Sequence, residues 1–150
     1  MKVFTAREVV TRTEIMLENY SKVLTIEGLT MLDMARRDIF PAVGSYVRAL
    51  AKTAAEVKAA LPGAETPAEE ETARRLLALN TAIAAKAKEL EALLSEAQTV
   101  AEAAAQAAFF AEKVLPVMQQ LRSAADEAES LTDEKAWPFP TYGDLLFSVT

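Results

Sequence analysis

Apolar residues recur at helical spacing through the first third of the chain. Steps of three and four residues relate the apolar positions that follow residue 8, as in an amphipathic helix: Val9, Val10, Met16, Leu17, Tyr20, Val23 and Leu24. Thr5 and Glu8 precede this stripe in the Thr-x-x-Glu pattern of a capping box. The stripe continues, with few polar interruptions, to Leu61. We therefore expect a first helical arm over residues 5–61.

Two features weaken this arm. Thr25 and Gly28 have low helix propensity, so we expect a bend or a short break near Ile26. Pro41 removes a backbone donor and clashes with the preceding turn, which predicts a kink near Phe40 rather than the end of the helix.

A second arm begins after a short segment of helix breakers. The sequence Leu-Pro-Gly at 61–63 ends the first arm, and the polar connection that follows favours an antiparallel return. Thr66 and Glu69 repeat the capping-box pattern. Pro67 stands at the first helical position, where its missing donor costs nothing. The next helix is therefore predicted to start at residue 67.

A seven-residue apolar repeat runs from residue 76 onward, which is typical of a helix that lies along a partner helix. One repeat position holds Leu76, Ile83, Leu90, Ala97, Ala104, Ala111, Met118 and Ala125. The other holds Leu79, Leu93, Val100, Ala107, Val114, Leu121 and Ala128, with Lys86 as its charged member. Pro116 interrupts the repeat and predicts a second kink.

Two all-α architectures fit this pattern. In a long antiparallel hairpin, residues 5–61 and 67–131 form two kinked arms. In a three-helix bundle, the second arm turns near Thr99, which forms a third capping-box pattern with Glu102. We prefer the hairpin, because no glycine or proline lies between Ala68 and Leu115 and the repeat keeps its phase through Thr99. The chain is then one helical domain over residues 1–150.

The C-terminal tail, residues 136–150, has a different character. Its prolines alternate with aromatic residues, which excludes a helix and favours an extended path that docks its rings. We expect this tail to seal the base of the hairpin close to Tyr20. The predicted interaction residues are Tyr20, Arg122, Trp137, Phe139, Tyr142 and Phe147.

Composition narrows the chemistry. The chain has no histidine and no cysteine, which excludes the usual zinc ligand sets and Ser/His or Cys/His catalysis. Its net charge is -6, with dispersed basic residues, so nucleic acid is not expected as a partner. No apolar run is long enough to span a bilayer and no signal region begins the chain, so we expect a cytoplasmic protein without a membrane partner.

One group of acidic residues and one group of arginines could each form a binding site or only surface ion pairs. Glu14 and Glu18, with Glu27 and Asp33, suggest a carboxylate metal site, but a solvated or ion-paired helix face is the preferred interpretation. The arginines at 12, 36, 37 and 122 suggest a phosphate clamp. We expect them instead to pair with Glu18, Asp126 or Glu129 across the hairpin base. No catalytic, cofactor-binding or metal-binding residue is assigned.

Segments near both ends resemble the C-terminal region of type III glutamine synthetases: residues 12–20, 26–27, 31–34, 41–42, 118–122 with Asp126 and Glu129, and 137–147. The resemblance implies a parent enzyme that makes glutamine from glutamate and ammonia with ATP and divalent metal, as a large ring-shaped homo-oligomer. The family's catalytic residues have no counterpart here. The resemblance therefore implies a non-catalytic structural or oligomerisation domain, whose partners are the catalytic domain of the same polypeptide and neighbouring subunits.

Two other functions compete with this hypothesis. A free-standing helical adaptor for protein–protein interaction would have the same amphipathic pattern. A small lyase or isomerase using lysine and glutamate is a weaker alternative, because the sequence shows no cluster of such residues.

Overall fold

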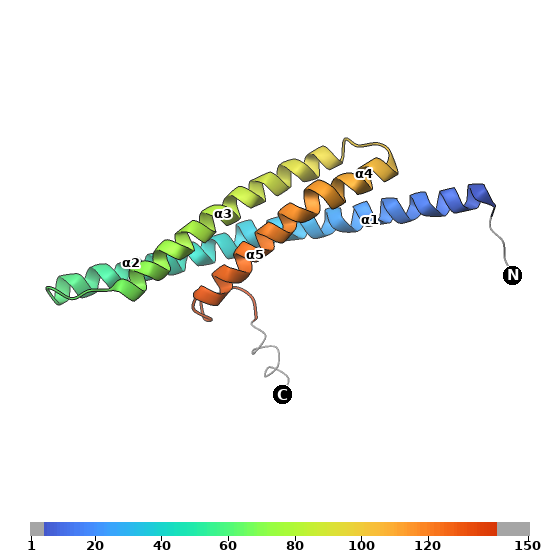
Figure 1. Ribbon diagram of the computed structural model, residues 1–150. Coiled ribbons are helices and arrows are strands. Elements are labelled where there is room, and N and C mark those ends of the chain that lie inside the picture. Colours follow the sequence, from blue (N-terminus) through green and yellow to red (C-terminus); the bar gives the residue numbers. More distant parts are fainter. Residues whose placement is uncertain (1–4, 141–150) are drawn as a thin grey trace, which may run out of the picture.

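The computed structural model describes residues 5–140, and all regular structure in this range is helical. The elements are α1 (Ala6–Met34), the π-helical segment η1 (Ala35–Ile39), α2 (Phe40–Ala60), α3 (Pro67–Ala97), α4 (Ala103–Phe109), the π-helical segment η2 (Phe110–Val114) and α5 (Leu115–Leu131). Because α1, η1 and α2 join without a loop, and α4, η2 and α5 do the same, the elements form three rods (Figure 1). The rods cover residues 6–60, 67–97 and 103–131.

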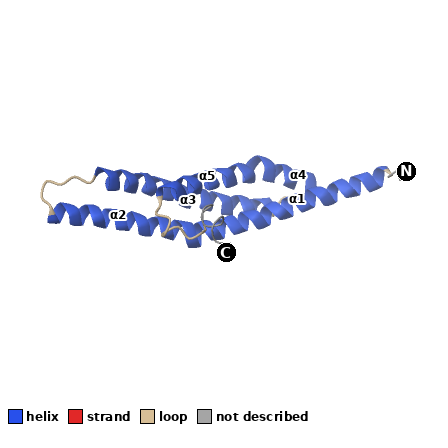
Figure 2. Ribbon diagram, turned by 90° about the horizontal axis from the view of Figure 1, so that it is seen from below, coloured by secondary structure: helices blue, strands red, loops and turns tan. Residues whose placement is uncertain are grey.

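The three rods pack side by side in antiparallel order. α3 packs on α2 and on α5, and α4 packs on α1 (Figures 1 and 2). The molecule is long and thin, because the first rod of residues 6–60 extends about 80 Å at 1.5 Å per residue. At one end, the N-terminal part of α1 projects beyond the other rods (Figure 1). The predicted all-α fold of antiparallel, proline-interrupted helices is confirmed.

The preferred continuous second arm is wrong, and the three-helix alternative is correct. α3 ends at Ala97 and α4 begins at Ala103, so the chain reverses within 98–102 without glycine or proline. The Ala97 carbonyl accepts hydrogen bonds from the Gln106 side chain at 2.9 Å and from the Val100 amide at 3.2 Å. Side chains and short-range turns thus satisfy carbonyls that a helix end leaves open.

The helix starts follow the sequence only in part. The capping box of Thr5 and Glu8 is present, with the Glu8 amide donating to Thr5 Oγ1 at 3.2 Å. α3 begins at Pro67 as predicted, but the second capping box does not form. The hydroxyl of Thr66 instead donates to the carboxylate of Glu70 at 3.4 Å. The third box is also absent, because Glu102 is the N-cap of α4 and makes no side-chain cap bond.

Both internal prolines follow a π-helical turn. The Phe40 amide, just before Pro41, donates to the carbonyl of Ala35. The Leu115 amide, just before Pro116, donates to the carbonyl of Phe110. Each bond reaches five residues back, so the widened turn accommodates a proline ring that would clash in a regular helix. The sequence predicted a disturbance at both prolines, and the structure shows its form.

α1 runs without a break through residue 26, so the predicted interruption is wrong. The Thr25 hydroxyl donates to the carbonyl of Ser21 at 2.8 Å, inside the helix. Gly28 is buried against α3, where a Cβ atom would lie 3.0 Å from the methyl groups of Leu94. Gly28 therefore permits a close approach of the two helices.

The core is a chain of apolar layers along the three rods. Its most completely buried side chains are Phe110, Leu76, Ile83, Leu90, Leu121, Val43 and Val114. In α3 the first predicted repeat position is buried, and a further one is buried beside it, at Ala73, Asn80, Ala87 and Leu94. α3 needs this wider stripe because it packs against two rods. In the third rod the second repeat position is buried, whereas Ala104 and Ala111 are exposed.

Candidate interaction surfaces

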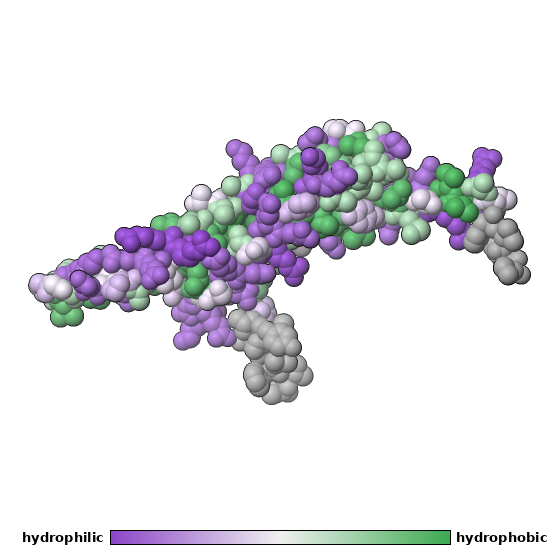
Figure 3. All heavy atoms as spheres, viewed as in Figure 1, coloured by the Kyte–Doolittle hydropathy of each residue, from purple (hydrophilic) through white to green (hydrophobic). Residues whose placement is uncertain are grey.

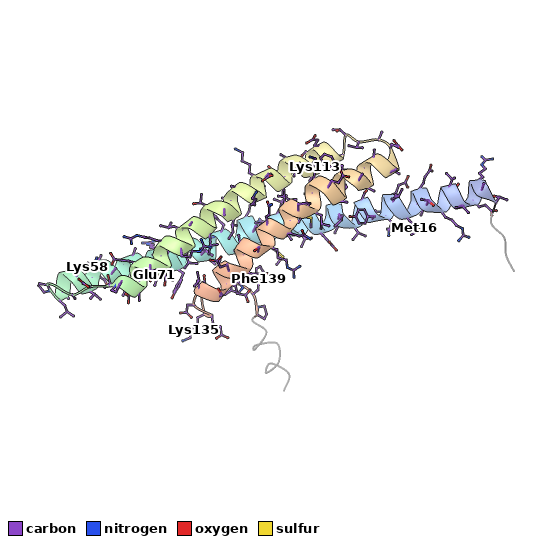
Figure 4. The ribbon with its side chains drawn as sticks, viewed as in Figure 1. Met16, Lys58, Glu71, Lys113, Lys135 and Phe139 are labelled. Carbon is purple, nitrogen blue, oxygen red and sulfur yellow. The ribbon has the colours of Figure 1, made fainter. Side chains whose placement is uncertain are left out.

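The free end of α1, defined as residues 6–20, is an exposed helix with large apolar side chains. Every residue in it is exposed except Leu17, which is half-buried. Met16 has 72% of its surface exposed and Ile15 has 59%. Figure 3 shows apolar surface near this end of the molecule, and Figure 4 shows Met16 on the part of α1 that projects beyond the other rods. Exposed apolar residues continue along α1 at Val23, Ile26 and Leu29.

These apolar side chains lie on more than one face of the helix. Val9, Met16 and Val23 are seven residues apart and form one stripe. Val10 and Leu17 lie in line with Leu24, which is buried in the bundle. Ile15 lies about 240° around the axis from Val9, at 100° per residue, and so faces away from both stripes. Because Val9 and Val10 are 100° apart, the two stripes form one continuous apolar face of the free end, and Ile15 lies apart from it among polar residues.

The described part of the C-terminal tail packs on the bundle. Trp137 is only 8% exposed, and its amide donates to the Asp133 carbonyl at 3.1 Å. Its ring meets the ring of Phe139 edge to face, with centroids 6.5 Å apart. Phe139, labelled in Figure 4, packs on the core. A cavity of 310 Å³ beside this turn is lined by Asp126, Glu129, Ser130, Thr132, Glu134 and Trp137. Tyr142 and Phe147 lie outside the described residues.

Tyr20 and Trp137 do not meet, so the expectation that they share one end of the molecule is wrong. The side chain of Gln98 donates to Thr25 Oγ1 at 3.4 Å at one end of the rod overlap, and Tyr20 lies a turn beyond Thr25. Residue 75 pairs with Glu127 near the other end, where Trp137 packs beside the end of α5. Residue 75 and residue 97, at the end of the same rod beside Gln98, are roughly 33 Å apart at 1.5 Å per residue. Tyr20 is 38% exposed on α1.

Ion pairs join neighbouring rods. Arg36 of η1 binds Glu91 of α3, Arg75 of α3 binds Glu127 of α5, and Lys58 Nζ lies 2.8 Å from Glu70 Oε1 across the α2–α3 connection. Arg36 therefore pairs with Glu91 and not with Glu18, Asp126 or Glu129, the partners that the sequence predicted. Arg37 pairs instead with Asp33, one turn away at 3.5 Å, and Arg122 is an exposed residue of α5.

The pKa shifts of these groups follow from the pairs. The hydrogen bond from Arg36 lowers the pKa of Glu91, and the hydrogen bond from Arg75 lowers the pKa of Glu127. The hydrogen bond from Lys58 likewise lowers the pKa of Glu70. The same bonds raise the pKa of Arg36 and of Arg75. These groups are therefore charged at neutral pH.

The remaining features of the described residues are modest. A second cavity, of 170 Å³, lies between η1 and α3 and is lined by Ala35, Arg36, Phe40, Ile83, Ala84 and Ala87. Between residues 5 and 140, no group of three or more acidic side chains is placed to hold a metal ion. No helix in that range is both long enough and apolar enough to cross a bilayer.

Comparisons with known proteins match this chain to glutamine synthetases. Residues 1–58 match the family model described as glutamine synthetase C-terminal domain. A glutamine synthetase from Butyrivibrio fibrisolvens is 38% identical over 150 residues, which cover 98% of this chain and 21% of that protein. The type-3 glutamine synthetase of Dictyostelium discoideum is 24% identical over 145 residues, covering 93% and 20%. A glutamine synthetase from Bacteroides fragilis (strain YCH46) is 28% identical over 151 residues, covering 98% and 21%.

These matches cover a much larger share of this chain than of its relatives. The chain is matched over nearly its whole length, whereas it spans about a fifth of the length of the curated relatives it matches. Its helices therefore correspond to one segment of a larger polypeptide in those relatives. The chain belongs to the glutamine synthetase C-terminal domain family.

Proposed function

We propose that this chain is a non-catalytic structural domain of a glutamine synthetase and contributes to assembly of the enzyme. The observation that carries the proposal is the match of 98% of the chain to 21% of the Butyrivibrio fibrisolvens glutamine synthetase. Synthesis of glutamine from glutamate, ammonia and ATP, with divalent metal, then takes place on the remaining four-fifths of such a polypeptide. The partners of this chain are that catalytic body and neighbouring subunits.

The electrostatics of the bundle support a structural role. A catalytic acid or base needs a pKa close to the working pH, which enzymes produce by burial or by neighbouring like charge. Here the pKa of Glu91 and Glu127 is shifted the opposite way, by hydrogen bonds from arginine. These carboxylates remain ionised and hold one rod against the next.

The distribution of side chains supports the same role. The buried layers consist mainly of leucine, valine, isoleucine, alanine, methionine and aromatic side chains. The ion-paired side chains lie at the surface, with exposures between 33% for Lys86 and 78% for Arg37. In such a bundle the apolar contacts and ion pairs hold the helices together, and the outer faces are free to contact other parts of a protein.

A domain exchange tests the proposal. The aligned segment of the Butyrivibrio fibrisolvens enzyme is replaced by this chain, and a second variant lacks the segment altogether. We expect the exchange variant to assemble into the parent oligomer and to form glutamine, the deletion variant to lose the oligomer, and the isolated 150-residue chain to form none. Assembly is measured by light scattering and activity by ATP-dependent glutamine formation.

Two results would contradict this proposal. ATP-dependent glutamine formation by the isolated chain would make it catalytic. Normal assembly and activity of the deletion variant would remove the structural role and leave the free-standing adaptor as the better hypothesis.

A further inference from the structure

We infer that the side-chain amide of Asn80 fixes the register of α3 against the first rod, beside the π-helical turn η1. The Nδ2 atom of Asn80 donates to the carbonyl oxygen of Phe40 at 3.2 Å. Without this bond, we expect α3 to populate a second alignment, shifted by one seven-residue repeat toward the free end of α1. Such a register contact belongs to the fold of the chain itself and does not depend on the proposed function.

Asn80 is a polar residue in an apolar stripe. It is 7% exposed and stands between Ala73 and Ala87, which are buried on the same face of α3. Its Oδ1 atom is buried and has no hydrogen-bond partner among residues 5–140. A buried polar atom without a partner costs free energy, so an apolar side chain of similar size would stabilise the bundle at least as well. Asn80 therefore contributes to the choice of alignment rather than to stability.

The carbonyl of Phe40 is accessible to this amide because residue 44 is glycine. In a helix, the side chain four residues on lies over the preceding turn. A Cβ atom at Gly44 would already lie 3.9 Å from Asn80 Nδ2, so a longer side chain would occupy the place of the amide. Seven residues earlier in the first rod, the corresponding residue is Arg37, whose side chain is long. Phe40 and Gly44 thus form an acceptor site that the neighbouring repeat does not offer.

The apolar layers by themselves permit a second alignment. The buried stripe of α3 repeats every seven residues, at Leu76, Ile83, Leu90 and Ala97. A shift of one repeat moves α3 by about 10 Å along the first rod and again places apolar residues mostly opposite apolar residues. The repeat alone therefore does not select the observed register.

Both ends of the bundle leave room for this shift. At one end, residues 67–72 are mostly polar and none of them is buried, so they can unwind and lengthen the connection from α2. At the other end, Val10 and Leu17 continue the apolar line of Leu24 beyond the end of α3. A shifted α3 would extend along this uncovered line, and the apolar surface that leaves water would offset part of the unwinding.

Other contacts oppose the shift less than Asn80 does. The ion pair of Arg36 and Glu91 would break, but exposed ion pairs contribute little to stability. Gly28 approaches only the terminal methyl groups of Leu94, which can rotate away. In the shifted alignment the Asn80 amide would remain buried without the acceptor at Phe40, which is costly. We therefore assign the register contact to Asn80.

Pulsed electron paramagnetic resonance between two spin labels measures the register. The chain has no cysteine, so cysteines introduced at the exposed positions Lys52 and Lys88 are its only labelling sites. Counted from the bond between Asn80 and Phe40, these positions lie about 30 Å apart along the rods, and a shift of one repeat would add about 10 Å. We expect one distance in the parent chain and a second, longer distance in Asn80→Leu.

Two further variants make the measurement specific. Ser21→Ala is the matched control, because Ser21 is also buried and its hydroxyl has no hydrogen-bond partner among the described residues. This variant is expected to keep the single distance of the parent. Asn80→Ala repeats the alanines at 73 and 87, so it removes the amide with a residue that the stripe already contains. It is expected to show the second distance, and it replaces Asn80→Leu if that variant does not fold.

Two results would overturn the assignment. A single, unshifted distance in both Asn80 variants would show that the apolar layers and the connections set the register without the amide. An equal second distance in Ser21→Ala would show that any change of a buried polar residue loosens the bundle, so that the bond to Phe40 has no special part in the alignment.

Discussion

The two halves of α1 have similar apolar residues and different surroundings. In the inner half, Leu24 and Leu32 are buried, and Gly28 brings the helix close to Leu94 of α3. In the free end, Val10 and Leu17 continue the line of Leu24, yet Val10 is 57% exposed. The difference arises because the chain turns at 98–102, so α3 ends and α4 starts before they reach the N-terminal part of α1.

The inner half of α1 and its free end are expected to contribute differently to folding stability and to interaction with other proteins. The inner half contributes to the free energy of unfolding, because its apolar surface leaves water when the chain folds. The free end contributes little to it, because its side chains remain in water. Substitutions should therefore have opposite consequences in the two halves for folding and for assembly.

The largest expected effect tests whether the bundle carries the stability. Phe110→Ala removes a ring that has no exposed surface and should lower the free energy of unfolding by about 3–5 kcal/mol. Met16→Ala at the free end should change it by less than about 0.5 kcal/mol. Urea denaturation of the isolated chain measures both, and similar values for the two variants would break the comparison.

The next effect concerns the described part of the tail. Trp137→Ala should cost about 3 kcal/mol, because the indole is 8% exposed and belongs to the core. Phe139→Ala should cost less, since that ring is half-buried. Thermal unfolding followed by circular dichroism measures both. An unchanged midpoint for Trp137→Ala would show that the tail adds nothing to the bundle.

Gly28 and Gly44 offer a matched pair within the first rod. Gly28→Val should destabilise by about 1–3 kcal/mol, because a Cβ there would already lie 3.0 Å from Leu94. Gly44→Ala should stabilise by about 0.5–1 kcal/mol, because its Cβ would meet only Asn80 at 3.9 Å and alanine has the higher helix propensity. Equal effects in denaturant unfolding would contradict the close approach of α1 and α3.

The smallest effect is a dependence of stability on pH. Hydrogen bonding to Arg75 lowers the pKa of Glu127 in the folded state, so the pair stabilises the fold above the unfolded pKa of about 4.3. That contribution is lost as the pH falls through the lower folded pKa. Arg75→Met should therefore flatten the acid limb of stability below about pH 5, whereas Arg48→Met, at another exposed arginine, should leave its slope unchanged. If stability fell with pH at the same slope in both variants, the Arg75–Glu127 pair would not contribute to the pH dependence.

Local sequence signals located most helix boundaries, but only the first of the three predicted capping boxes forms. Pro67 starts α3 and the breakers at 61–63 end α2, because proline and glycine restrict the backbone wherever they stand. The Thr66–Glu69 pattern did not become a capping box, because Glu70 bonds both Thr66 and Lys58. The position of Glu70 depends on Lys58 of the neighbouring rod, and a pattern of adjacent residues does not include that contact.

The amino-acid sequence by itself determined that the protein is helical, where its prolines disturb the helices, and that its core consists of repeating apolar layers. These properties depend on backbone sterics and on spacing along one helix. Only the tertiary structure decided that the chain turns after Ala97, because the Gln106 side chain caps that helix end from the next rod. It also decided which apolar residues are covered, since the seven-residue repeat is the same whether a partner helix is present or has already ended.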